Sequence, residues 1–143
     1  MEFRIMLSEK EYKELIAPYI KTLSFIDTAH NSTNDLVIKT AGVPDIDKEK
    51  INRLDTPEAD VRWDLYDVFV NTALCLMNRI VSHFNSNHKF EVEFEFGGFY
   101  FIKNEDESNP IYIADLAPNN LYEGFITVLE KFFEVLQEAS KND

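Results

Sequence analysis

Apolar residues recur at helical spacing near the start of the chain. Over residues 12–26 they repeat every three or four positions, which aligns them along one face of a helix. Ser8 and Glu11 stand just before this stretch in the S-x-x-E order of a capping box, so the helix should begin there. Pro18 cannot donate a backbone hydrogen bond, and we expect the helix to kink or divide at this residue. Residues 3–7 predict a short lead-in strand.

The helical pattern stops at residues 31–56. Asn31-Ser32-Thr33-Asn34-Asp35 has the composition of a turn, and Leu36-Val37-Ile38 predicts a short strand. Gly42-Val43-Pro44 is a second break, and residues 46–54 predict a short charged helix. The sequence determines this region least, and a mobile loop is one interpretation of it.

A long helix is predicted over residues 57–84. Thr56-Pro57-Glu58 combines an N-cap residue, a proline at the first helical position and an acid at the positive end of the helix dipole. Apolar side chains occupy most of its surface, which predicts a central helix buried on most sides. Asn85-Ser86-Asn87 should end it. Cys75, the single cysteine, lies in an apolar run and reads as a small buried hydrophobic residue.

The spacing of apolar residues then changes from helical to alternating. Phenylalanine and valine alternate with glutamate over residues 90–96, which predicts a half-buried strand. Gly97-Gly98 suits a two-residue hairpin turn, and residues 99–102 form the returning strand. This turn would set Phe96 opposite Phe99. The pairs that follow from it are Phe94 with Phe101, Val92 with Lys103, Glu95 with Tyr100 and Glu93 with Ile102.

A third strand and a last helix complete the pattern. Residues 110–113 predict the third strand, after an acidic loop over residues 104–109. Asn120 and Glu123 mark the start of a helix with an apolar stripe that runs to Leu136. The sequence therefore predicts one α+β domain over residues 1–143. It has a helical N-terminal half with a long central helix, a three-stranded antiparallel meander and a C-terminal helix packed on the sheet.

One face of the predicted sheet carries a row of acids. Alternate residues of a strand stand about 7 Å apart on one face, so the three glutamates of the first strand form a regular line of negative charge. Aromatic residues within a charged surface are typical of the centre of a binding interface. An ordinary solvent-facing side of a half-buried sheet is the alternative. The predicted partner-binding residues are Glu91, Glu93, Glu95, Tyr100, Ile102 and Tyr112, with Glu105, Asp106 and Glu107 in the adjacent loop.

The charge of the chain agrees with such a surface. The formal net charge is −12, and residues 89–143 contribute −8 of it, from 12 acidic and 4 basic side chains. A field of this sign repels nucleic acid and anionic membranes and speeds the encounter with a basic protein. A role in solubility alone is the other interpretation.

Motifs for catalysis or metal binding are absent from the sequence. It has no phosphate-binding glycine loop and no G-x-S-x-G elbow, and the histidines at positions 30, 83 and 88 lack zinc-ligand spacing. They are predicted to be solvated loop or helix-end residues. The carboxylate pairs look solvent-facing, whereas acid–base catalysis needs one desolvated carboxyl. We expect no cofactor, no metal and no enzymatic activity. The chain shows neither a signal peptide nor a membrane span, which predicts a cytoplasmic location.

The C-terminal part of the sequence resembles a known family. The stretch Gly97-Gly98-Phe99-Tyr100-Phe101-Ile102, the acidic loop, Pro110-Ile111-Tyr112-Ile113 and the phenylalanine-rich last helix resemble the end of SUKH-type immunity proteins and other small acidic immunity proteins. The resemblance covers roughly the last 50 residues, while the N-terminal half departs from the SUKH arrangement.

Several functions follow from this resemblance and from the residues. The resemblance implies a protein that binds and blocks a toxin domain, often a basic nuclease. The abundance of Asn, Lys, Ile, Phe and Glu favours a bacterial or phage source. A phage inhibitor that mimics nucleic acid to block a host defence enzyme is a second hypothesis. A homo-oligomeric structural or adaptor protein, such as a homodimer, is a third.

Overall fold

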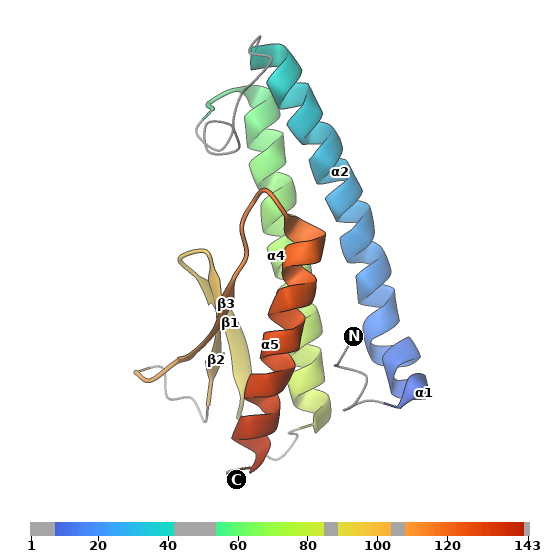
Figure 1. Ribbon diagram of the computed structural model, residues 1–143, viewed down its shortest axis with the longest axis vertical. Coiled ribbons are helices and arrows are strands. Elements are labelled where there is room, and N and C mark those ends of the chain that lie inside the picture. The colour runs from blue at the N-terminus through green and yellow to red at the C-terminus, as the bar shows by residue number, and fades with distance from the viewer. Residues whose placement is uncertain (1–7, 42–53, 85–88, 104–107, 142–143) are drawn as a thin grey trace.

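The computed structural model describes residues 8–41, 54–84, 89–103 and 108–141 (Figure 1). Several predicted features lie outside these ranges. They are the lead-in strand, most of the short charged helix, the end signal after residue 84 and the acidic loop residues 105–107. The elements in chain order are α1 (Glu9–Glu11), the π-helix η2 (Tyr12–Ile16), α2 (Ala17–Ala41), α4 (Pro57–Phe84), β1 (Glu91–Glu95), β2 (Gly98–Ile102), β3 (Ile111–Asp115) and α5 (Leu121–Lys141).

The α+β arrangement predicted from the sequence is confirmed. Helices α2 and α4 lie side by side along the long axis of the molecule, and the sheet lies on the far side of α4 from α2 (Figure 1). The three strands form an antiparallel meander in the order β1-β2-β3, and α5 packs against the sheet. Phe125 of α5 joins the layers, because its ring lies 5.8 Å from that of Phe69 on α4 and 6.2 Å from that of Phe99 on β2.

The first helix divides close to its proline, as predicted. A capping box at Ser8 and Glu11 begins α1, and a five-residue π-helical turn follows directly. The N–H of Ala17 bonds to the carbonyl of Tyr12, five residues back, and α2 begins at this residue, one position before Pro18. The wider turn therefore lies where the proline would leave an α-helical carbonyl without a donor.

The predicted turn and strand at residues 31–38 are wrong, because α2 continues unbroken to Ala41. Packing overrides local preference here: Val37 is fully buried and forms a small apolar cluster with Ala59 of α4. The hydroxyls of Ser32 and Thr33 donate to the carbonyls of Thr28 and Ala29, four residues back, at 3.1 and 2.8 Å. Such bonds satisfy these side chains without ending the helix.

Helix α4 has the predicted bounds but is less enclosed than predicted. One face carries the buried residues, among them Phe69, Leu76 and Ile80. Val61 and Val68 are each about half exposed, and Cys75 is exposed too, so the prediction of a buried cysteine is wrong. These three positions are spaced seven apart, which places them on one face of the helix.

The hairpin turn lies one residue earlier than predicted. Phe96 and Gly97 form it, with φ angles of 52° and 79°, as a type I′ turn requires. Phe94 therefore pairs with Phe99, and Glu93 pairs with Tyr100. The predicted register is wrong by two residues, but a shift of two keeps the residues that remain in the strands on their predicted faces. Phe96, which leaves the strand for the turn, does not keep its predicted inward side.

Candidate functional site

One face of the sheet carries the predicted row of acids. Glu91 and Glu95 of β1 are exposed and Glu93 is partly buried, and the three alternate with the inward-facing Val92 and Phe94. Paired residues share a face, so the register places Tyr100 beside Glu93 on this side. The glutamate row and Tyr100 are therefore brought together as the sequence predicts.

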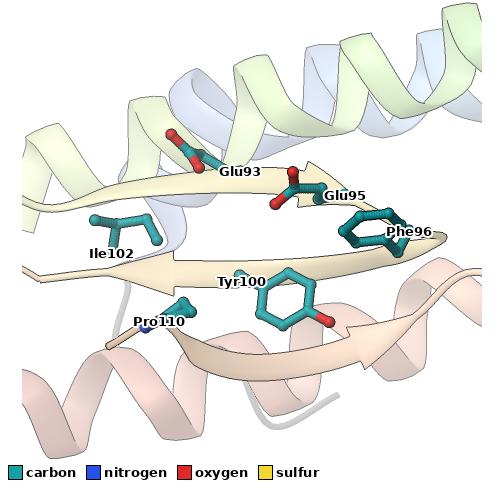
Figure 2. A pocket seen from close by; sticks show the side chains of 6 residues that line it. All are labelled: Glu93, Glu95, Phe96, Tyr100, Ile102 and Pro110. Atoms are coloured by element: carbon teal, nitrogen blue, oxygen red, sulfur yellow. The ribbon is translucent and has the colours of Figure 1, made fainter. Parts of the chain in front are cut away.

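The helices lie on the opposite face of the sheet. In Figure 2 the sheet is seen from its glutamate side, with the helices behind it. Phe99 and Phe101 point to that helical side and are fully buried. We call the side seen in Figure 2 the open face; its residues are Glu91, Glu93, Glu95, Phe96, Tyr100, Ile102, Pro110, Tyr112 and Asp115.

Strand β3 adds an acid that the sequence analysis missed. Tyr100 pairs with Tyr112 and Phe99 pairs with Ala114, so Ile113 is an extra residue in β3, a β-bulge. Ile113 and Ala114 are consecutive and both buried. The bulge thereby returns the side chain of the following residue, Asp115, to the open face.

Gly98 provides the room for that carboxylate. A Cβ atom on Gly98 would lie 2.6 Å from Oδ1 of Asp115, so the aspartate occupies the space that any larger residue would fill. Gly98 pairs with Glu95 on one side and with Asp115 on the other. The two carboxylates consequently flank the same backbone position in the middle strand.

The two tyrosines of the open face lie edge to face. Their ring centroids are 5.6 Å apart at an interplanar angle of 60°. Desolvation raises the pKa of the Tyr112 phenol, and the hydrogen bond to Asp115 and its charge raise it further. The Tyr112 side chain is nevertheless 51% exposed.

A hollow of about 400 Å³ opens on this face (Figure 2). Phe96 lies in the hairpin turn at the margin of this hollow and is 93% exposed. The predicted register had placed it among the inward-facing residues. Ile102 lines the hollow but is only 2% exposed, which leaves it little surface for a partner. The lining residues are Glu93, Glu95, Phe96, Tyr100, Ile102 and Pro110.

A second polar cluster lies inside the molecule, between α2, α4 and the start of α5. The Arg62 side chain is fully buried. Its Nε donates to the side-chain oxygen of Asn34. Its Nη2 donates to Oδ1 of Asn119 at 2.7 Å and to the Pro118 carbonyl at 3.2 Å. Within the described residues, Nη1 of Arg62 and Nε2 of His30 have no hydrogen-bond partner, and both are sealed from solvent. The cluster joins three segments, and its arginine is hidden from solvent while Asn34 and Asn119 are partly exposed.

His30 belongs to this buried cluster, so its prediction as a solvated histidine is wrong. It is buried because α2 continues past the predicted turn and packs on α4. Burial lowers its pKa to about 4, and the nearby charge of Arg62 lowers it further in the same direction. The ring is therefore neutral at physiological pH. Burial also raises the pKa of Tyr66 to about 12, and its hydroxyl donates to the Leu116 carbonyl at 2.7 Å.

His83 lies near the end of α4 and is exposed, as predicted for a helix-end histidine. Its Nε2 lies 2.5 Å from Oε2 of Glu11, and this pair links α4 to the first helical turn. Hydrogen bonds from the Ser8 backbone and then from His83 lower the pKa of Glu11 to about 2. Glu11 and His83 thus fix the start of the first helix against the end of α4.

In the described ranges, no group of three or more His, Cys, Asp or Glu side chains is arranged to hold a metal ion. No described helix combines the length and apolar composition that crossing a bilayer requires. Comparison of the chain with protein-family models, curated proteins and solved structures gives no match. The physical chemistry of the open face is what remains to indicate a function.

Proposed function

We propose that this chain binds a basic protein through the open face and blocks its activity, as an immunity protein neutralises a toxin. The observation that carries the proposal is the exposure of a glutamate row and aromatic rings together on the one side of the sheet away from the helices. A nuclease-type toxin domain, which needs basic residues to hold nucleic acid, is the partner this surface fits best.

The charge of this face favours fast association. Glu91, Glu93, Glu95 and Asp115 lie on a small area, and opposite charge on a partner steers the encounter at low salt. Tyr100 and Tyr112 supply large, rigid contact area among these charges. Interfaces are enriched in such aromatic residues at their centres.

Both edges of the sheet are poor sites for an added strand, which favours binding on the face. At the β1 edge, Asn78 of α4 accepts from the Val92 N–H at 2.7 Å and donates to the Val92 carbonyl at 3.0 Å, which mimics a neighbouring strand. Strand β3 begins directly after Pro110 and contains the bulge at Ile113. Prolines and bulges both hinder edge pairing.

Mimicry of nucleic acid is the second candidate. The spacing of about 7 Å between alternate residues along β1 is similar in scale to that of successive phosphates. The target would then be a nucleic-acid-binding enzyme of a host in place of one cognate toxin. The identity of the captured partner separates the two: a single cognate toxin supports immunity, whereas a nucleic-acid-binding enzyme of a host defence supports mimicry.

Immobilised protein tests the proposal with two matched variants. The first carries Glu91→Gln, Glu93→Gln and Glu95→Gln. The second carries Glu123→Gln, Glu134→Gln and Glu138→Gln at exposed positions of α5, and so changes the net charge equally. Lysate from the source cells is applied at low salt, bound proteins are eluted in salt steps, and each is identified by mass spectrometry.

We expect one basic protein to be held by the wild type and the α5 variant and lost from the open-face variant. Purified, that protein should associate with the open-face variant at least about tenfold more slowly at low salt, with a flatter salt dependence. Its enzymatic activity should fall when the wild-type chain is added. Equal retention by the open-face variant, or a captured enzyme that stays fully active, would contradict the proposal.

A further inference from the structure

We infer that the hollow on the open face receives the side chain of one exposed arginine of the partner. This inference rests on the proposed function and names the group that the open face recognises. It follows from the chemistry of the lining, which combines carboxylates with aromatic and aliphatic surface.

The lining is divided by chemistry along the hollow. Glu93 and Glu95 lie along the β1 side, with the Tyr100 ring next to them on β2 (Figure 2). The Phe96 ring stands at the turn end. Ile102 and Pro110 form the apolar opposite end. A ligand that fits this lining needs an apolar stem and a flat cationic head.

Arginine matches both requirements. Its aliphatic stem can lie along the exposed Pro110, while the guanidinium stacks on an aromatic ring and donates to a carboxylate. Lysine carries a compact, strongly hydrated charge that neither stacks as a plane nor donates in a fork. We therefore expect the hollow to prefer arginine over lysine, and carboxylates without aromatic rings would show no such preference.

The backbone at Phe96 supports a binding role for its ring. A positive φ is unusual for a bulky residue, and this backbone conformation is strained. Because the ring is 93% exposed, its packing does little to offset the strain. The turn requires a positive φ here but not a phenylalanine, because asparagine, aspartate or glycine adopts it more readily. Strained residues of this kind cluster at functional sites. The turn also presents the ring from a fixed hairpin, which limits the entropy lost on binding.

Amide chemical shifts of the isotope-labelled wild-type protein test this inference. The probes are three capped peptides, Gly-Ser-Gly-Xaa-Gly-Ser-Gly, in which Xaa is arginine, lysine or citrulline. Citrulline keeps the shape of arginine without its charge. We expect millimolar binding of the arginine peptide, with shifts concentrated at residues 93–102. They should be at least about threefold larger than with lysine at equal concentration and absent with citrulline.

Single substitutions assign the effect to the hollow. Phe96→Ala and Tyr100→Leu should reduce the arginine shifts towards those of lysine, Glu95→Gln should reduce both, and Glu134→Gln on α5 should change neither. Unperturbed signals from the helices confirm that each variant is folded. Equal shifts with arginine and lysine, shifts centred elsewhere, or no shifts at all would overturn the inference.

The peptide experiment and the partner-capture experiment can fail separately. If the open-face triple variant loses its basic partner while the peptides show no preference for arginine, the proposed function stands and the inference fails. If the peptides prefer arginine but the triple variant keeps the partner, the hollow exists and the proposed mode of partner binding fails.

Discussion

Two phenylalanines of the same hairpin illustrate the difference between the two faces of the sheet. Phe99 is fully buried, with its ring 4.9 Å from that of Phe94 and 6.2 Å from that of Phe125. Phe96, three positions earlier, is almost fully exposed. The Phe99 ring is part of the core that holds the fold together, whereas the Phe96 ring packs on little of the protein. An identical residue type therefore serves stability on one side and is available for binding on the other.

The largest effect should come from this pair of phenylalanines. Phe99→Ala removes a ring from a close-packed site and should lower the free energy of unfolding by about 3–5 kcal/mol. Phe96→Ala should change it by less than about 0.5 kcal/mol, because the ring lies in solvent. Urea denaturation followed by circular dichroism measures both. Similar losses in the two variants would show that the open face also holds the fold.

The next largest effect should come from acidification, which should lower stability through the buried His30 and not through the open face. The pKa of His30 is about 4 in the folded protein and near 6.5 when unfolded, so the unfolded chain binds a proton first as the pH falls. Keeping His30 neutral and buried contributes to the free energy of unfolding. This contribution is fully present above pH ~6.5, and about 2–3 kcal/mol of it is lost as the pH falls towards ~4.

Unfolding free energies measured from pH 7.5 to 5.5 check this prediction. The wild type should lose stability over this range, and His30→Gln should flatten the slope. The variant with Glu91→Gln, Glu93→Gln and Glu95→Gln should keep the slope, because it changes the open face alone. An unaltered slope in His30→Gln would mean that the histidine is already protonated or solvated in the folded state.

A smaller effect is expected at the boundary between the two faces. Asn78→Ala removes both side-chain bonds to the Val92 backbone and should cost about 1–2 kcal/mol. It also uncovers the β1 edge, so light scattering at high concentration should rise faster than for the wild type. Thr72→Ala, elsewhere on α4, is a control that should leave scattering unchanged.

The smallest effect is expected at the turn. Phe96→Asn suits a type I′ turn before Gly97 and should raise the unfolding free energy by about 0.5–1 kcal/mol. The same change should weaken binding of the arginine peptide. Phe96→Ala, which keeps a β-carbon at positive φ without the amide, should show the weaker binding and no stability gain. A variant that gains both stability and affinity would argue against a binding role for the ring.

Much of the open face could be predicted from the alternation of residues along β1 and β2. Alternation survives an error of two residues in register, so Glu91, Glu93, Glu95 and Tyr100 were assigned to the correct side. The turn itself was misassigned, because Gly97-Gly98 is a favoured turn pair, whereas the structure places Phe96 at a positive φ that bulky residues seldom adopt.

Asp115 could not be predicted from alternation. Without the bulge at Ile113, residue 115 would point to the helical side, and a single extra residue reverses this. The sequence carries one weak signal, which is the interruption of the alternation by two consecutive apolar residues, Ile113 and Ala114, before Asp115. Local composition failed similarly at residues 31–38, where contacts with α4, distant in sequence, decide the conformation.

The Arg62 cluster has a consequence for how long the folded state lasts. Arg62 bonds to Asn34, 28 positions away, and to Asn119, 57 positions away, so these contacts can form only after three distant segments have docked. Contacts made after the folding transition state chiefly slow unfolding. We expect Arg62→Met to speed unfolding while leaving the folding rate nearly unchanged. For the inhibitor that we propose, a slower unfolding rate of the free chain would lengthen the time for which it stays competent to bind a newly made partner.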